Sequence, residues 1–425
     1  MMIPAIKNNN NTPHSADANI GLMLPLMVLA CGHVLSNLMR TMPAVTVDVM
    51  AADLGCTPQT LVSLTSVYHF AFALCQIPVG VALDRFSIRG VSLTLFAGTI
   101  FGACVAATAG TPASFFVSQM LLGMATSGML MTPMALAARR MPPAKFAMWS
   151  GLILAVGNAG MLLSASPLAF LVENWGWRAA YWISAGICVV IAGLVMLCVP
   201  RDKPLHSVIP GLLQEVRTVV RLGLSPSLRG ILMLSLVSLG VILVLRGVWA
   251  GPWLMEMKGL SRLDAGTVLT IYTVTLVIGP LLAGAIDHAL GHRRQLILVT
   301  QIIAVGLLLV MAGGGVGGFV SNAFGVERLP AQIDTGLLVM IGLFTCVQSL
   351  IYAMARDAAG PGNTGKALSA TNLAMFLGTA LMQSATGVIA SFAGLAAVLA
   401  SMAAFLLVGT LAFYIQTRNA SRLKA

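Results

Sequence analysis

The chain has 425 residues, of which 58% are hydrophobic and only 9% charged, and its mean hydropathy is +0.92. Soluble domains carry about 25% charged residues, so most of this surface must face lipid instead of water. Every backbone polar group inside a bilayer must bond within the protein, which leaves helices or closed barrels as spanning elements. Barrel strands alternate apolar and polar residues, whereas this chain has long unbroken apolar runs. The composition therefore predicts an all-α membrane protein.

The net charge of +11 does not indicate nucleic-acid binding, because the basic residues lie mostly in short loops between apolar runs. Six of the seven cysteines lie inside apolar runs, and none shows paired or metal-ligand spacing. We therefore expect no disulfide framework, no metal site and no cofactor.

In chain order, the polar, Asn-rich residues 1–19 are expected to form a disordered cytoplasmic segment. A bilayer core needs about 20 apolar residues per helix. Runs of this kind predict an N-terminal six-helix bundle over 20–199, a central loop over 200–228, a C-terminal six-helix bundle over 229–415 and a tail over 416–425. The twelve predicted spans are 20–47, 61–83, 91–110, 113–138, 147–172, 179–199, 229–255, 264–286, 296–318, 335–355, 367–391 and 394–415.

The central loop contains apolar residues at helical spacing between Leu212 and Val220, interleaved with polar and charged ones. This pattern predicts a short helix. Two placements remain open: a helix lying on the inner membrane surface, or a linker helix packed on the bundle.

The two halves of the chain look like copies of each other. Asp84 and Asp287 follow the second and eighth spans at an offset of 203 residues (287 − 84), and Pro78 and Pro280 lie 202 apart (280 − 78). Internal repeats of this kind are a feature of many transporters. We therefore expect two pseudo-symmetric bundles.

The distribution of Lys and Arg predicts the orientation. With the amino terminus inside, 18 of the 24 basic residues fall on the inner side and four in outer loops. By the positive-inside rule both termini are cytoplasmic and the number of spans is even. The expected location is the cytoplasmic (inner) membrane, as a multi-pass protein.

Short motifs after the second and eighth spans resemble the loop signature of the major facilitator superfamily, as does Gly176-Trp177-Arg178 after the fifth. The signature residues are Gly80, Asp84, Arg85 and Arg89 in the first copy, and Asp287, Gly291, Arg293 and Arg294 in the second. Ser87, Ile88 and His288 depart from the usual pattern. The resemblance implies twelve helices, alternating access and a cytoplasmic latch formed by Gly80, Asp84, Arg85, Arg89, Asp287, Arg293 and Arg294. The alternative is that these charges only set the topology.

Among the basic residues, only Arg40 and Arg246 lie within apolar runs, at an offset of 206 (246 − 40), and no acidic residue lies deep in any span. A charge inside a transmembrane helix costs at least about 2.5–3.5 kcal/mol, so each is a functional hypothesis. Two guanidinium groups without a counter-charge favour an anionic substrate, because Arg binds carboxylate and phosphate bidentately. The alternative is that both snorkel to the outer surface.

The stretches around these arginines are similar to the organophosphate–phosphate antiporters and related organic-anion porters of the superfamily, which also place one Arg in the first span and one in the seventh. The stretches that carry this resemblance are Leu38-Met39-Arg40 with Ala44, and Val244-Leu245-Arg246-Gly247-Val248 with Trp253. The resemblance implies that the two arginines bind an anion, without identifying it as phosphate.

Helical spacing adds neighbours to both arginines: His33 and Asn37 share a face with Arg40, and Trp249 with Arg246. His33 and His69 are candidates for proton coupling, since histidine titrates near neutral pH, or else are hydrogen-bonded interior residues. Tyr272 and Tyr352 are further candidates for contact with the substrate, although interhelical hydrogen bonding is the commoner role of such residues.

Together these features predict a secondary active transporter that moves a small organic anion, and not an enzyme. The alternatives are an exporter of hydrophobic or cationic compounds, or a non-transporting membrane sensor or enzyme. The spans contain neither a carboxylate typical of cation exporters nor a group of nucleophiles or metal ligands. The expected partners are a small-molecule substrate, the lipid bilayer and a coupling ion, either a proton or an exchanged anion, around a monomeric protein.

Overall fold

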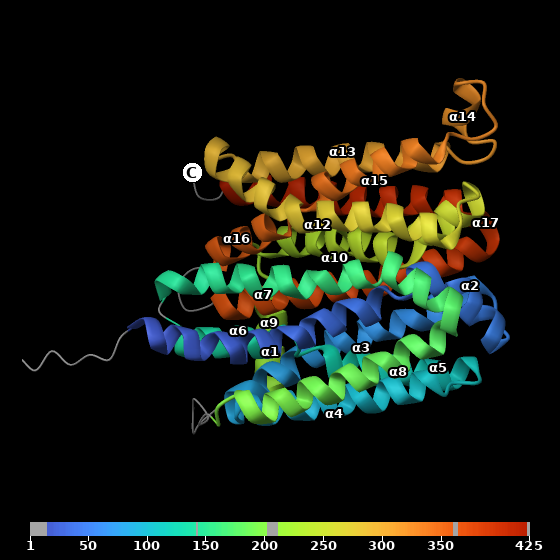
Figure 1. The fold of residues 1–425 in the computed structure, drawn as a ribbon. Coiled ribbons are helices and arrows are strands. Elements are labelled where there is room, and N and C mark those ends of the chain that lie inside the picture. The colour runs from blue at the N-terminus through green and yellow to red at the C-terminus, as the bar shows by residue number, and fades with distance from the viewer. Residues whose placement is uncertain (1–14, 142, 202–210, 360–363, 423–425) are drawn as a thin grey trace, which may run out of the picture.

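A computed structural model describes residues 15–141, 143–201, 211–359 and 364–422. Within these ranges the chain is built from helices joined by short turns, with no strand (Figure 1). The helices of the N-terminal half are α1 Ser15–Thr41, α2 Pro43–Leu54, α3 Pro58–Arg85, α4 Ile88–Ala107, α5 Pro112–Thr126, α6 Met131–Arg140, α7 Pro143–Leu163 and α8 Ser166–Cys198.

The remaining helices follow the linker. They are α9 Leu212–Gly223, α10 Arg229–Val244, the π-helical turn η1 Leu245–Trp249, α11 Ala250–Pro252, the π-helical turn η2 Trp253–Met257, α12 Arg262–Leu290, α13 Arg293–Gly313, α14 Phe319–Ala323, α15 Ala331–Thr345, α16 Gln348–Ala359 and α17 Thr364–Arg422.

These helices form twelve membrane spans. Ten helices or joined helix pairs within the described ranges are long and apolar enough to cross a bilayer. The longest, α17, contains a break at Gly394 and supplies spans eleven and twelve. The remaining span, the fifth, is α7 continued by the part of α8 before its own break at Gly176. The prediction of an all-α membrane protein with two six-helix bundles is confirmed.

Both breaks require glycine. Gly176 has φ 76° and ψ 166°, and Gly394 has φ 76° and ψ −178°. This combination of positive φ with ψ near 180° is open almost only to glycine, because a Cβ would clash with the backbone. Each glycine therefore turns the chain back on itself at the junction of two spans.

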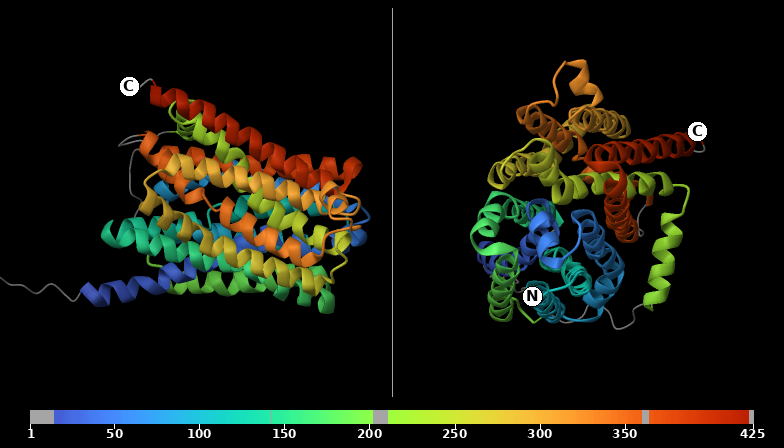
Figure 2. Two further views of the ribbon diagram at one scale, coloured as in Figure 1. Left: turned by 90° about the horizontal axis from the view of Figure 1, so that it is seen from above. Right: turned by 90° about the vertical axis from the view of Figure 1, so that its right-hand side faces the viewer.

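The helices run nearly parallel to one another (Figure 1). One end of the bundle holds both ends of the described chain and the linker, and we call it the terminal face. The opposite end, which carries α14, is the far face. Seen end-on in Figure 2, the helices of the N-terminal half (blue to green) form one group and those of the C-terminal half (yellow to red) another.

The segments outside the spans differ in part from expectation. The predicted disordered segment covered residues 1–19, but α1 begins at Ser15, and residues 1–14 lie outside the described part. The predicted linker helix is α9. It packs on α3 and α17, and its Val219 is buried while Leu213 is exposed. The helix therefore rests on the bundle and bridges the two halves at the terminal face.

Candidate functional site

Arg40 lies close to the middle of the first span. A single turn at Met42 separates α1 from α2, so the helical segment continues beyond the predicted residue 47 to Leu54 at the far face. Arg40 stands 18 residues after Leu22, the start of its apolar stretch, and 14 before Leu54. At this depth its side chain cannot snorkel to either face.

The Arg40 guanidinium is only partly satisfied. Its Nη2 donates to the side-chain oxygen of Asn37, whereas the buried Nε and Nη1 have no hydrogen-bond partner among the described residues. The guanidinium carbon lies 6.0 Å from the centre of the Phe72 ring and 5.5 Å from that of Phe376, within the range of a cation–π interaction. These two rings come from opposite halves, with centroids 4.2 Å apart.

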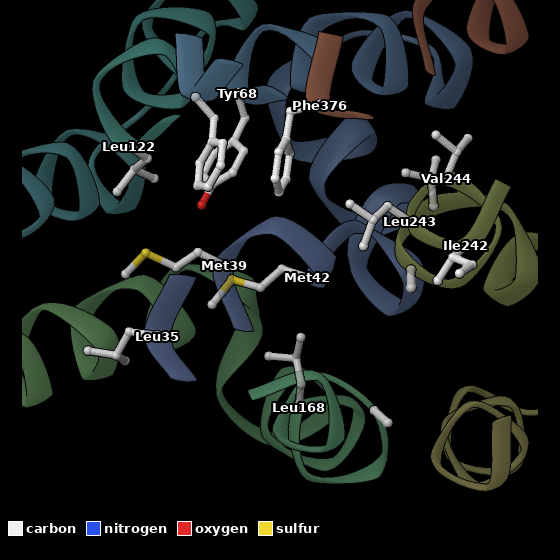
Figure 3. Close-up of a cluster of buried hydrophobic side chains, with 14 of the residues drawn as sticks. Leu35, Met39, Met42, Tyr68, Leu122, Leu168, Ile242, Leu243, Val244 and Phe376 are labelled. Atoms are coloured by element: carbon white, nitrogen blue, oxygen red, sulfur yellow. The ribbon is translucent and has the colours of Figure 1, made fainter. Parts of the chain in front are cut away.

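Figure 3 shows the apolar surroundings of these rings. Tyr68 and Phe376 extend toward Met39 and Met42 of the first span, and Leu243 and Val244 of the seventh span complete the cluster. The Phe376 ring beside Arg40 therefore belongs to a cluster of flat and flexible apolar side chains, which can pack against the apolar body of a ligand that carries an anionic group.

Arg246 lies at the equivalent place in the seventh span, inside the π-helical turn η1. It stands 17 residues after Arg229 and 11 before Met257, the ends of the joined helix. A π-turn inserts an extra residue into a helix and occurs often at functional sites. The turn shifts the helical register at Arg246, which sequence spacing did not reveal.

The Arg246 side chain is fully buried and bound at three points. Nε donates to the Thr273 hydroxyl at 2.6 Å, and Nη2 donates to the Met161 carbonyl at 2.5 Å and to the Ser164 hydroxyl at 3.2 Å. Nη1 is buried without a partner among the described residues. Met161 and Ser164 belong to the N-terminal half, so Arg246 joins the two halves.

The two arginines occupy pseudo-equivalent but chemically different sites. Arg40 faces α3 and α17, the second and eleventh spans, and Arg246 faces α12 and α7, the eighth and fifth. In the described residues neither arginine forms an ion pair, so no carboxylate neutralises them. The surroundings of Arg40 are aromatic, and those of Arg246 are hydroxyl and carbonyl oxygens.

The other residues predicted around the arginines lie within the bundle. Asn37 donates to the Gly157 carbonyl at 2.9 Å and lies 3.2 Å from Nε2 of the buried His33, so these two residues and Arg40 form a chain along α1. The Trp249 indole donates to the Thr386 hydroxyl at 3.0 Å. Trp249 therefore contacts the eleventh span, whereas Arg246 contacts the fifth and eighth spans.

The second proton-coupling candidate, His69, is buried. Its ring packs edge-on against Tyr68, with centroids 5.4 Å apart. Neither ring nitrogen makes a hydrogen bond of ordinary geometry with a described residue, although the Gln383 side chain lies within interaction range. Gln383 itself donates to the Thr65 hydroxyl at 2.7 Å across the two halves.

The two tyrosines differ in their contacts. The Tyr272 hydroxyl is fully buried and makes no hydrogen bond within the described ranges. Tyr352 donates to Asn372 at 2.8 Å, and the Asn372 amide donates to Gln76 at 2.8 Å. Gln76 in turn donates to the Ser127 carbonyl at 3.0 Å. Tyr352 therefore begins a hydrogen-bonded chain that crosses from the C-terminal half to the N-terminal half.

The far face is closed by contacts between the halves. Arg262 binds both carboxylate oxygens of Asp48, at 2.9 and 2.7 Å, and Ser166 lies 3.1 Å from the Thr270 hydroxyl. The first and seventh spans also touch: a Cβ on Gly251 would lie 1.6 Å from the Ala44 carbonyl oxygen. Only glycine permits this approach.

The C-terminal copy of the loop signature forms an ion-pair network. Arg293 binds Asp287 at 2.8 Å and Asp357 at 2.9 Å, and Arg356 also binds Asp357 at 2.9 Å. Arg294 donates to the Thr417 hydroxyl at 2.8 Å and lies over the Tyr414 ring. These bonds tie the start of α13 to α12, α16 and the end of α17.

The N-terminal copy is arranged differently. Asp84 at this position is exposed. Arg139, at the end of the fourth span, donates to the Leu83 carbonyl at 2.6 Å. Gly80 packs near Met131 of the same span.

Several functional features were missed from the sequence. The partners of Arg246 lie 82 and 85 residues away, and the Phe72–Phe376 pair joins opposite halves. A usable signal did exist: Gly247 and Gly251 are four residues apart, a spacing typical of close helix packing. The buried pair of Lys258 and Asp334, 2.8 Å apart, was also not predicted.

The twelve-span bundle, its two related halves and the two loop-signature motifs define a transporter fold. The family model for the Major Facilitator Superfamily matches residues 29–326 of the chain. The chain therefore belongs to the major facilitator superfamily.

Its curated relatives include resistance and export proteins. The tetracenomycin C resistance and export protein of Streptomyces glaucescens is 31% identical over 42% of this chain and 34% of its own length. The methyl viologen resistance protein SmvA of Salmonella typhimurium is 26% identical over 43% and 38%. The chloramphenicol resistance protein of Streptomyces lividans is 32% identical over 42% and 46%. The matches thus span about a third to a half of these relatives.

Solved structures share the fold. A POT family transporter in complex with 5-aminolevulinic acid superposes with a TM-score of 0.75 at 12% identity, over 92% of this chain and 95% of the other. The nucleoside transporter NupG gives a TM-score of 0.72 at 13% identity, over 92% and 99%. At such identities the likeness extends to the fold alone.

Proposed function

We propose that this protein is a secondary active transporter that moves a small organic anion across the cytoplasmic membrane by alternating access. The terminal face, which holds both ends of the described chain, is its cytoplasmic side, in line with the bias of basic residues. One observation carries the proposal: Arg40 and Arg246 are buried at mid-span without a carboxylate partner among the described residues. An anionic ligand would supply the missing charge.

Arg40 is the primary anion-binding residue. Its free Nε and Nη1 point to different sides of the guanidinium, so each can donate to a separate acceptor oxygen of an anionic ligand. Phe72 and Phe376 flank the guanidinium, and the methionines beside them are adaptable apolar neighbours. The substrate is therefore an anion with an apolar or aromatic body.

The residues around Arg40 have supporting roles in this proposal. Asn37 orients the guanidinium, and His33, next to Asn37, is the candidate for proton coupling. His69, Trp249, Tyr272 and Tyr352 remain candidate lining or coupling residues. The latch residues Gly80, Asp84, Arg85, Arg89, Asp287, Arg293 and Arg294 regulate opening of the terminal face, where the C-terminal copy is the one that is closed by ion pairs.

A second candidate function is export of hydrophobic or cationic compounds. Two observations favour it: the names of the resistance and export relatives, and the aromatic and methionine cluster beside Arg40. The same relatives favour efflux over uptake. The bare guanidinium of Arg40 opposes a cationic substrate, because like charges repel in a low-dielectric site.

A thermal-shift screen of the purified protein distinguishes the two. The panel contains benzoate and other aromatic carboxylates, sugar phosphates, amino acids and lipophilic cations. A ligand that binds the folded state raises the unfolding temperature in proportion to its occupancy. Stabilisation by an anion supports the proposal, whereas stabilisation confined to cations would refute it.

The hit is then tested with variants in proteoliposomes. Arg40→Ala and Arg40→Lys should both lower affinity by about 100-fold, because the first removes a buried charge-assisted pair and the second removes the planar set of guanidinium donors. Arg328→Ala is the matched control, since Arg328 is an exposed far-face arginine that binds only the Met257 carbonyl within its own half. Full transport by both Arg40 variants would contradict the binding role.

A further inference from the structure

The two intramembrane arginines differ in what their donors do. Arg40 keeps the donors on Nε and Nη1 free, whereas Arg246 uses Nε and Nη2 for three hydrogen bonds, two of which cross between the halves. Residues at equivalent places in a duplicated bundle have thus acquired different environments. This difference cannot be explained by a shared role in gripping one anion.

Hydrogen bonds within the N-terminal half hold the acceptors of Arg246 in place. The Ser164 hydroxyl donates to the Met161 carbonyl at 2.9 Å and lies 2.6 Å from the hydroxyl of Thr41. On the other side, Thr273 fixes Nε within the C-terminal half. One arginine therefore links a fixed acceptor pair on the N-terminal half to a fixed anchor on the C-terminal half.

We propose that Arg246 is a far-face lock, which holds the two halves together on the far-face side of the bundle. Its hydrogen bonds to Met161 and Ser164 break when the far face opens. The nearby contact of Gly251 with Ala44 and the Asp48–Arg262 ion pair lie on the same side of the bundle. The bonds of Arg246 to Met161 and Ser164 cross between the halves, so Arg246 sets their relative orientation.

The buried charge makes this lock reversible. A guanidinium without a counter-ion loses its hydration when the far face closes, which opposes closure. Its hydrogen bonds to Met161 and Ser164 favour closure. The hydrogen bonds exceed the desolvation cost by a small margin, so the closed state is favoured while the open state stays accessible, as alternating access requires. The lock needs only this alternation, and does not depend on whether the substrate is an anion.

Hydrogen–deuterium exchange of the ligand-free full-length protein in lipid nanodiscs tests the proposal. Arg246→Gln and the smaller change Ser164→Ala remove cross-half bonds, and Thr273→Val removes the anchor, which Thr273→Ser should restore. We expect amides over 41–57 and 248–264, at the far face, to exchange about tenfold faster or more in Arg246→Gln. Amides over 80–92 and 284–296, at the terminal face, should exchange more slowly.

This reciprocal change separates opening from local unfolding, which would speed exchange without protecting the other face. Two matched controls accompany it. Arg40→Gln removes the equivalent buried guanidinium but no cross-half hydrogen bond, and Ser238→Ala removes a buried hydroxyl that has no partner among the described residues. Both should change far-face exchange by less than about threefold.

Unchanged exchange in Arg246→Gln would overturn the lock, as would acceleration at both faces together. If that variant does not insert into membranes, Ser164→Ala and Thr273→Val decide the matter by the same reciprocal pattern. An equally large effect of Arg40→Gln would also refute it, because the two arginines would then not differ in role. Failure of the anion proposal would leave these results unaffected.

Discussion

Replacing Gly251 by alanine should force the far face open. The Cβ would lie 1.6 Å from the Ala44 carbonyl oxygen, whereas real Cβ atoms essentially never approach below 3.0 Å. The seventh and first spans must therefore separate by about 1.4 Å at this point. Backbone atoms on both sides make the contact, so a side-chain rotation cannot relieve it.

The separation reaches the hydrogen bonds of Arg246, five residues earlier. Its bond to Ser164, 3.2 Å long, would exceed the limit of a hydrogen bond after such a shift, and its bond to Met161 would be lost or severely weakened. Each bond to a charged donor contributes about 1.5–3 kcal/mol. Since the exposed guanidinium regains water, we expect a net change of about 1.5–3 kcal/mol, or roughly ten- to a hundredfold in the closed-to-open ratio.

Pulsed electron paramagnetic resonance measures this ratio with spin labels at the exposed far-face positions Ala52 and Gln332, one in each half. The seven native cysteines are free in the structure, so they are replaced beforehand. The matched control is Gly336→Ala, a helical glycine whose Cβ would meet nothing within 4 Å. Gly251→Ala should populate a longer distance and the control should not. A wild-type distance distribution in Gly251→Ala would refute the reasoning.

Two further predictions concern far-face carboxylates. Asp48→Asn removes the partly exposed ion pair with Arg262, which is worth about 1 kcal/mol after solvent screening, and should raise the open population several-fold. A charge-reversed pair at these two positions should restore closure. An unchanged distance between the spin labels in Asp48→Asn would contradict this role. The pKa of Asp53 lies below its usual value because its carboxylate accepts hydrogen bonds, first from Trp177 and then from Arg178. The stability that these bonds confer is present above the ordinary carboxyl pKa of about 3.9 and is lost as pH falls through the lowered pKa. The unfolding temperatures of the wild type and Asp53→Asn should therefore converge as pH falls from about 7 to about 3, and a constant difference would exclude this carboxylate as the cause.

The fold could be predicted from the sequence because apolar run length and loop charge are local properties. They defined the spans, and the repeat of Asp84 at Asp287 revealed the duplication. Boundaries were less certain. The helical segment of the first span continues beyond the predicted residue 47 because Pro43 begins a new helix, α2, after a single turn.

The candidate site was only partly accessible in this way. A lone charge in an apolar run is a strong signal, so Arg40 and Arg246 were identified. Their partners were not, because helix packing brings together residues such as Met161 and Arg246 that no periodicity connects. Face assignment from spacing also failed at the π-turns: Trp249 was expected on the Arg246 face, but its indole donates to Thr386 of the eleventh span at 3.0 Å.

The turns at Gly176 and Gly394 couple the transporter to its lipid surroundings. Each turn joins two consecutive spans with no loop between them, and the first span of each pair contacts the opposite half. A connection of one residue allows the two spans little independent movement. We therefore expect the fifth and sixth spans to tilt together, and the eleventh and twelfth to do the same. Spans six and twelve expose large apolar side chains such as Leu197 and Val408 to the acyl chains. A change in bilayer thickness should therefore change the free energy of tilting these spans during the transport cycle.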